Sequence, residues 1–340
     1  MRLHIDDFDY PFDPSLIAQY PLPKRDQSGL LVLDRKRGTI EHRRFFEIGA
    51  YLNKGDVLVL NNTKVIPCRL AGRKDKTGGH VELLLIRRIK DDTWEVMTWG
   101  RLKAGLKIIF SPSCWCEVME SNTGRTIVRF YFEGDWNNLL SKIGHLPIPP
   151  YIKRDSAEGD REWYQTVFAS ESGAIAAPTA GLHFTQDIID SLRAKGVIVT
   201  FITLHVGIGT FKPVNSEWIE EHKMSYEWLE VSEDAVNVIK KAKNTCARIV
   251  AVGTTSVRAL EQAAISGELK AFKGETGLFI YHGFQFKTAD AMITNFHLPK
   301  STLLMLVMAF AGRENILKAY EEAVRLRYRF YSYGDAMMIV

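Results

Sequence analysis

Two loops of small residues, each containing a histidine, are the strongest candidates for a ligand site. They read G-A-I-A-A-P-T-A-G-L-H-F-T at 173–185 and H-V-G-I-G-T-F at 205–211. Because few side chains obstruct such backbone, it can approach a ligand closely. Between the loops the pattern predicts a helix capped by Thr185 and a buried strand at 197–203, which places the loops at the edge of an α/β sheet. The loop residues that we expect to contact a ligand are Thr179, Gly181, Gly207, Gly209 and Thr210.

Three histidines, His183, His205 and His297, occupy similar loop settings and are candidates for acid–base chemistry. Imidazole titrates near neutral pH, which suits a general acid or base. A buried structural histidine is the alternative for each one. Metal ligation stays open, although no H-x-x-x-H spacing supports it. His297 belongs to the run T-N-F-H-L-P-K-S, in which Asn295 adds an amide suited to a polar ligand.

The run V-G-T-T-S-V-R at 252–258 predicts an anion site. A strand, a tight turn and a helix start follow one another here, and the free amides of a helix N-terminus favour negative charge. Thr254 and Thr255 add hydroxyl donors, and Arg258 can pair with a carboxylate. The run is neither a P-loop nor a G-x-G-x-x-G fingerprint. The alternative is that Thr254 or Thr255 merely caps the helix.

Basic residues beside aromatic ones are compatible with a nucleic-acid surface. The tail R-Y-R-F-Y-S-Y-G-D at 327–335 interleaves arginine with rings that can stack on bases. A partly buried strand edge is the alternative for the tail, and a solvated face is the alternative for the other basic clusters. The net charge of +4 permits nucleic-acid binding without arguing for it. The basic residues of interest are Arg69, Arg73, Lys153, Arg154 and Arg329.

A chain of 340 residues, long enough for two domains, must position these groups. From residue 160 onward helices and strands alternate, which predicts an α/β fold with a mainly parallel sheet flanked by helices. The expected elements here include a helix at 162–168, a strand at 277–281, and helices capped by Ser232 and Ser301. Between 64 and 132 the pattern predicts strands alone, and therefore a small antiparallel barrel or sandwich. The expected strands of this part are 65–70, 80–86, 94–99, 107–110, 114–119 and 126–132.

The barrel is expected to interrupt the α/β domain. The first 60 residues lack a core of their own, so we place them with the later helices and strands. The run L-P-I-P-P-Y at 146–151 is a stiff connector typical of a boundary. We therefore expect a discontinuous α/β domain of residues 1–62 and 150–340, with a β-barrel domain inserted at 63–149.

The four cysteines do not complete a zinc pattern. Cys114 and Cys116 lie two apart in a predicted strand, without a second pair, so we expect reduced thiols and no metal site. The amino end lacks the apolar core of a signal peptide, and the most apolar run, 302–311, is too short to span a membrane. These features predict a cytoplasmic protein without a membrane partner.

Ten stretches, in order and nearly end to end, match one family. They are L-I-A-Q-Y-P at 16–21, G-D-V-L-V-L-N-N-T-K-V-I-P at 55–67, P-I-P-P-Y-I-K at 147–153, Y-Q-T-V-F-A at 164–169, A-A-P-T-A-G-L-H-F-T at 176–185, T-L-H-V-G-I-G-T-F-K-P-V at 203–214, E-H-K-M at 221–224, V-G-T-T-S-V-R at 252–258, I-T-N-F-H-L-P-K-S at 293–301 and Y-R-F-Y-S-Y-G-D-A-M at 328–337. The set closely resembles the S-adenosylmethionine:tRNA ribosyltransferase-isomerases of queuosine biosynthesis, the QueA family. The chain departs from the family's usual pattern at Gly29, Cys68 and His282.

The resemblance implies a specific reaction. S-adenosylmethionine is consumed as a ribosyl donor, and no further cofactor is expected. The acceptor is 7-aminomethyl-7-deazaguanine at the wobble position of a tRNA, and the products are epoxyqueuosine-tRNA, adenine and methionine. The basic residues of both domains would contact the tRNA, and no obligate protein partner is expected. The resemblance also implies a discontinuous α/β domain with an inserted β-barrel.

That chemistry suggests roles for the candidate residues. A base must remove a proton from the ribose 5′ carbon beside the sulfonium, and a donor must assist the departure of adenine. We expect His183 and His205 to do this work, with His297 and Asp335 in reserve, and Asp335 to orient the attacking amine. Thr254, Thr255 and Arg258 would hold the methionine carboxylate, and the glycine loops would admit the ribose and adenine.

Two other functions are weighed against this one. A Rossmann-type methyltransferase is the second enzyme class, although the amino end lacks a glycine-rich loop; it would release S-adenosylhomocysteine in place of adenine. An RNA-binding module with barrel and α/β parts is the non-enzymatic class, and it would bind tRNA without turnover.

Overall fold

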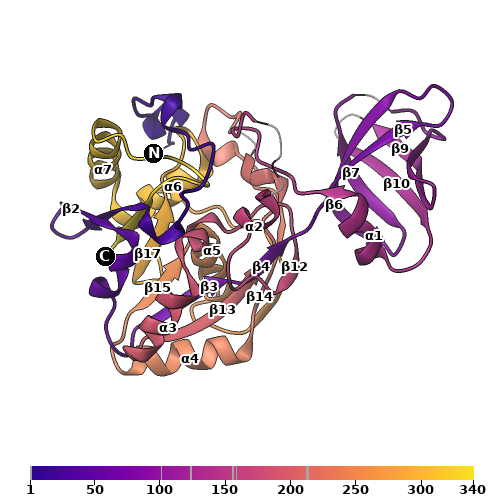
Figure 1. The fold of residues 1–340 in the computed structure, drawn as a ribbon. Helices are drawn as coiled ribbons and strands as arrows, with labels where there is room; N and C mark the ends of the chain where they lie inside the picture. The colour runs from indigo at the N-terminus through magenta and orange to yellow at the C-terminus, as the bar shows by residue number, and fades with distance from the viewer. Residues whose placement is uncertain (1, 101, 123–124, 155–156, 158, 212–213) are drawn as a thin grey trace. The chain divides into compact units, whose positions relative to one another are not determined.

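The computed structural model describes residues 2–100, 102–122, 125–154, 157, 159–211 and 214–340 (Figure 1). The chain divides into two compact units, an α/β unit of Met1–Lys64 with Pro150–Val340 and a barrel unit of Val65–Pro149. The boundaries expected from the sequence fall after residues 62 and 149. Because the α/β unit is assembled from both ends of the chain, its first strand lies beside its last one (Figure 1).

The α/β unit is built on a nine-stranded mixed sheet, in the order β16-β14-β13-β3-β15-β17-β18-β1-β2. The strands β13, β3, β15 and β17 are parallel neighbours, as are β18 and β1, and the other four pairings are antiparallel. This confirms the α/β class and refines the sheet from mainly parallel to mixed. The strands are β1 (Gly29–Asp34), β2 (Thr39–Arg44), β3 (Val57–Asn61), β13 (Ile198–Leu204), β14 (Glu227–Val231), β15 (Ile249–Val252), β16 (Phe272–Thr276), β17 (Ala291–Asn295) and β18 (Ala336–Ile339).

Both faces of this sheet are buried, which explains why its central strands are continuous apolar runs. In β1, Leu31 and Leu33 pack into one apolar core, whereas Leu30 and Val32 pack into a second core on the opposite face. The first core is covered by α4 to α7, and the second by α3 and the 3-10 helix η4. The α-helices of the unit are α2 (Asp160–Trp163), α3 (Gln186–Ala194), α4 (Glu233–Asn244), α5 (Thr254–Ala263), α6 (Thr302–Ala311) and α7 (Arg313–Arg325).

Short elements connect these layers. A two-stranded sheet pairs β4 (Thr63–Val65) with β12 (Glu171–Ala174), next to the start of the barrel unit. The 3-10 helices are η1 (Ile5–Phe8), η2 (Pro14–Leu16), η3 (Arg25–Gln27), η4 (Phe45–Tyr51), η5 (Thr179–His183), η6 (Ile208–Phe211) and η7 (Ile219–Glu221).

The barrel unit closes on itself. Its order is β11-β5-β6-β7-β10-β9-β8, and β5 also pairs with β8, so six antiparallel strands form a closed barrel. At this closure Gly72 leaves no room for a side chain, because a Cβ atom there would lie 2.8 Å from Ile108 and Phe110. The inserted antiparallel barrel is thereby confirmed. Its elements are β5 (Arg69–Lys74), β6 (His80–Lys90), β7 (Thr93–Thr98), β8 (Lys107–Ser111), β9 (Cys114–Asn122), β10 (Arg125–Phe132), α1 (Trp136–Ile143) and β11 (Gly144–His145).

Some expected elements are wrong in extent. The strand expected at 277–281 is found at 272–276 as β16, and the helix expected at 162–168 is the single turn α2. The strand expected at 65–70 is interrupted after Val65, because Pro67 cannot donate a ladder hydrogen bond. In the described part of the chain no helix is both long and apolar enough to cross a membrane.

Candidate functional site

Two adjoining cavities lie where the parallel strands of the sheet end. Both are lined by Val206, Thr210, Thr254, Thr255 and Leu303. Val206 comes shortly after β13 and Thr254 shortly after β15, so the carboxyl ends of parallel strands supply these residues. Open α/β sheets bind their ligands at this edge. The glycine-loop and anion-site stretches of the sequence therefore meet in one place.

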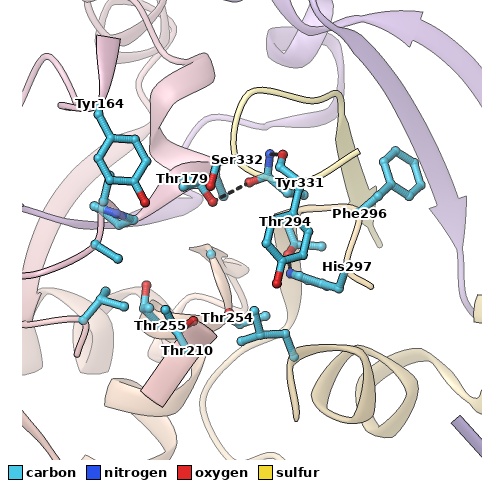
Figure 2. A pocket seen from close by; sticks show the side chains of 18 of the residues that line it. Tyr164, Thr179, Thr210, Thr254, Thr255, Thr294, Phe296, His297, Tyr331 and Ser332 are labelled. Atoms are coloured by element: carbon cyan, nitrogen blue, oxygen red, sulfur yellow. Dashed lines mark hydrogen bonds between the residues drawn. The ribbon is translucent and has the colours of Figure 1, made fainter. Parts of the chain in front are cut away.

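The first cavity is lined by aromatic rings and hydroxyl groups (Figure 2). The edge of Tyr151 contacts Tyr331, with 3.9 Å between ring centroids, and the Tyr151 hydroxyl is hydrogen-bonded to Ser332. Burial raises the pKa of Tyr331 to about 12, so its phenol stays protonated at neutral pH. The wall also includes Tyr164, Thr179, Thr294, Asn295, Phe296 and His297.

His297 lies in the wall of the first cavity as a neutral donor. Burial lowers the pKa of His297 to about 3. The buried Tyr320 hydroxyl accepts the His297 backbone N–H and lies 3.3 Å from Nδ1. Since a buried hydroxyl proton needs an acceptor, we assign Nδ1 as the acceptor of the Tyr320 hydroxyl proton. Nε2 then carries the imidazole proton, and its hydrogen-bond contact is Thr294 Oγ1 at 3.4 Å.

His183 lies outside the first cavity and connects to it through Asn295. The amide of Asn295 donates to the Tyr331 carbonyl and to His183 Nε2, each at 3.1 Å, and its oxygen accepts from Thr179 Oγ1. His183 Nδ1 therefore carries the proton and donates to Ser28 Oγ at 2.8 Å. Burial, with nearby arginines, lowers the pKa of His183 to about 3. Both ring nitrogens are engaged, so His183 is built to hold Asn295 and Thr179 in place.

His205 and Asp335 line neither cavity. His205 stacks on Trp228 and is hydrogen-bonded through Nδ1 to Thr63 at 2.7 Å, and burial lowers its pKa. The Asp335 carboxylate accepts the backbone N–H groups of Gly29 and Arg329, both at 2.7 Å. The structure thus uses this carboxylate to join the start of β1 to the tail before β18.

The second cavity, of about 420 Å³, contains the predicted anion-binding groups. Helix α5 begins at Thr254. The residue before it, Gly253, has a φ of +87°, which favours glycine, and no side chain caps this helix start. Arg258 is 6 % exposed and forms an ion pair with Glu227. Thr254 and Thr255 line the cavity walls, and neither provides the capping bond considered as the alternative.

The loop glycines have different surroundings. Gly209 lines the second cavity, next to Ser225. The Gly207 amide donates to Glu227 Oε1 at 2.8 Å. A Cβ atom on Gly181 would lie 2.9 Å from Phe168, so this glycine serves close packing beneath the loop.

The candidate tRNA-binding residues are mostly engaged within the protein. Arg69 forms a bidentate pair with Glu82 in the barrel, and the Arg73 guanidinium donates to the Gly78 carbonyl. Arg154 forms a buried ion pair with Asp160. The Arg329 guanidinium donates to the Tyr20 carbonyl. Lys153 is exposed.

Several lining residues escaped the analysis of single motifs. Tyr151 and Tyr164 lie in the first cavity, and Ser216 and His222 in the second. Tyr331 and Ser332, which also line the first cavity, belong to the tail at 327–335 whose rings the sequence suggested for base stacking. Tyr151, Tyr164 and His222 belong to stretches that carried the family resemblance, which was the available signal. Among the described residues no group of three His, Cys, Asp or Glu side chains is arranged to hold a metal.

Comparisons with known proteins agree on one group. A family model described as "Queuosine biosynthesis protein" matches residues 5–339. A protein of Sulfurihydrogenibium sp. (strain YO3AOP1), named S-adenosylmethionine:tRNA ribosyltransferase-isomerase, is 50% identical over 340 residues, covering 99% of this chain and all of the relative. One of the same name from Staphylococcus haemolyticus (strain JCSC1435) is 49% identical over 344 residues, with 99% and 100% covered.

A solved structure is similar over the same span. It is the crystal structure of an S-adenosylmethionine tRNA ribosyltransferase from Thermotoga maritima, at 38% sequence identity and a TM-score of 0.58. The match covers 98% of this chain and 100% of that one. Sequence and fold therefore point to the same group of proteins.

Proposed function

The chain belongs to the queuosine biosynthesis protein family, and we propose how its two cavities serve the reaction of an S-adenosylmethionine:tRNA ribosyltransferase-isomerase. The enzyme transfers and isomerises the ribosyl part of S-adenosylmethionine onto 7-aminomethyl-7-deazaguanine in tRNA, releasing adenine and methionine. We place it in the cytoplasm with its tRNA, and no metal or further cofactor takes part.

One observation supports the placement of S-adenosylmethionine. The aromatic first cavity and the polar second cavity share five lining residues at the carboxyl edge of the sheet. S-adenosylmethionine has a flat base at one end, an amino acid at the other and the reacting ribose between them. The base accordingly occupies the first cavity, and the ribose lies beside Thr210 and Thr254.

The histidines then have unequal roles. His297 presents Nε2–H in the first cavity, so it donates a hydrogen bond to the departing adenine. A protonated Nε2 cannot act as a base toward the same group. His183 holds Asn295 and Thr179, which line the cavity, and is a positioning residue.

The test is product analysis with purified enzyme, S-adenosylmethionine and tRNA carrying the deazaguanine precursor, after exhaustive chelation. Free adenine is the expected product. S-adenosylhomocysteine would identify a methyltransferase, and tRNA binding without turnover would identify an RNA-binding module. Activity that returns only with a divalent metal would contradict metal independence. His297→Gln is expected to lower kcat by about 10²-fold or more, with melting temperature as the control.

A further inference from the structure

Three buried polar atoms without a hydrogen-bond partner lie in residues that line the second cavity. Among the described residues of this cavity, these atoms are Arg258 Nη2, Thr255 Oγ1 and Ser216 Oγ. Buried polar groups are nearly always paired, so each unpaired one needs a reason. Three in one cavity, all able to donate, indicate that the cavity is built for an acceptor.

The Arg258 guanidinium is fixed by two of its three nitrogens. Nη1 donates to Glu227 Oε2, and Nε donates to the Leu278 carbonyl at 3.1 Å. Glu227 is itself held by the Gly207 amide. With the side chain 6 % exposed and locked on two sides, Nη2 is the nitrogen left to bind a ligand.

The start of α5 adds a favourable field to the same cavity. Thr254 and Thr255 are the first two residues of this ten-residue helix, and the first amides of a helix have no intrahelical partner. The Ser256 hydroxyl donates to the Val252 carbonyl at the end of β15, at 2.7 Å, so it is already engaged within the protein. Thr255 Oγ1 therefore stands beside the free amides of this helix start, in a residue that lines the cavity.

We propose that the second cavity binds a carboxylate, that of the amino-acid end of S-adenosylmethionine, through Arg258 Nη2, Thr255 Oγ1 and Ser216 Oγ. This assignment rests on the proposed function. The three unpaired groups can all donate a hydrogen bond, which favours an anion. The two carboxylates in the cavity lining are already engaged, Glu227 by Arg258 and the Gly207 amide and Glu221 by Arg2. Glu227 already neutralises part of the Arg258 charge, which favours a monoanionic carboxylate over a doubly charged phosphate. Free methionine, which carries the same carboxylate, binds the same groups as a product.

The decisive comparison is between S-adenosylmethionine and its decarboxylated analogue. Adenine release gives kcat/KM for each substrate with tRNA present. A hydrogen bond to a charged group contributes about tenfold to 150-fold in affinity. Wild-type enzyme is expected to prefer S-adenosylmethionine by at least about tenfold. Thr255→Val and Ser216→Ala should each reduce that preference by about tenfold, by slowing the reaction of S-adenosylmethionine alone.

Matched controls separate this effect from general damage. Thr39→Val and Ser191→Ala make the same chemical changes at exposed positions of β2 and α3, and should leave both substrates unchanged. Equal kcat/KM for the two substrates in wild type, or equal slowing of both in Thr255→Val, would overturn the carboxylate site. Absence of adenine with either substrate would overturn the proposed function itself.

A second measurement needs neither the decarboxylated substrate nor the loss of Arg258, which would leave Glu227 buried without its partner. L-Methionine is expected to inhibit wild type competitively against S-adenosylmethionine, and L-methioninol, which lacks the carboxylate, is expected not to inhibit. Thr255→Val should weaken inhibition by L-methionine by about tenfold. Equal inhibition by both compounds would place the amino-acid end elsewhere.

Discussion

At the scale of single residues, hydrogen-bond partners decide what each histidine can do. His183 accepts at Nε2 and donates at Nδ1, so it has no free nitrogen for proton transfer unless Asn295 or Ser28 moves. The Nε2–H of His297 is directed to Thr294, and both residues line the first cavity. The two side chains are both buried and have the same lowered pKa, but only His297 lines the first cavity, which is why their proposed roles differ.

Because His183 is neutral in the folded protein, the free energy of unfolding is expected to depend on pH. Its pKa is about 3 when folded, against 6.5 for an ordinary histidine, so below pH 6.5 the unfolded chain binds a proton that the folded chain does not. The contribution of neutral His183 to the free energy of unfolding is therefore fully present above about pH 6.5 and is lost as the pH falls toward 3. The loss is about 1.4 kcal/mol per pH unit. Urea unfolding between pH 7.5 and 5.5 measures it.

The matched variants are His183→Gln and His282→Gln. Glutamine keeps a donor and an acceptor at position 183 but does not titrate, so the variant should lose about 1 kcal/mol less on acidification from pH 6.5 to 5.5. His282 is exposed in the same unit, so its variant should retain the wild-type slope. An unchanged slope in His183→Gln would show that the histidine is charged in the folded enzyme.

At the scale of elements, Arg154 ties the connector after the barrel unit to α2. Its guanidinium meets the Asp160 carboxylate at 2.8 and 2.5 Å, and their side chains are 10% and 3% exposed. Breaking a buried pair leaves an uncompensated charge and costs about 3–5 kcal/mol. Arg154→Ala should lower the melting temperature strongly. Arg193→Ala, which removes an exposed ion pair within α3, should change stability by about 0.5 kcal/mol or less.

The sequence predicts a tRNA contact for Arg154, and the buried ion pair with Asp160 offers a structural role as the alternative. Thermal melts and KM for tRNA on the same variant distinguish the two roles. A rise in KM at an unchanged melting temperature would restore the tRNA contact and argue against the structural role.

Local rules predicted the elements better than the site. The caps Thr185, Ser232 and Ser301 were predicted from their side chains and the apolar residues that follow, and each accepts its helix amide. The predicted position of β16 was wrong because this edge strand contains charged residues and Gly274, and therefore lacks the buried apolar run that marks a strand in sequence. The neighbours of Arg258 were out of reach, since Glu227 is 31 residues away and meets it only after the sheet forms.

At the scale of the whole molecule, a change of pattern predicts the antiparallel barrel within an α/β fold, and the structure confirms this barrel. The sequence shows strands alone between 64 and 132 and alternating helices and strands from residue 160. This contrast can be recognised because each pattern extends over many residues. The surface that receives tRNA was not visible in the same way. In sequence, an arginine that binds phosphate cannot be distinguished from one that pairs with a carboxylate of its own chain. Arg69, which pairs with Glu82, is an example of the second kind.

Lys153 is the best placed of the five basic candidates to contact a phosphate. It is exposed, its backbone N–H donates to Gln19, and no described residue accepts a hydrogen bond from its ammonium. Each neutralised phosphate contributes about 0.7–0.9 to the slope of log affinity against log salt. Lys153→Ala should therefore flatten that slope by about this amount and raise KM for tRNA. Lys241→Ala, an exposed lysine of α4, is the matched control and should keep the wild-type slope. Fluorescence anisotropy over a potassium chloride series measures both, and equal slopes for Lys153→Ala and wild type would place the tRNA on another surface.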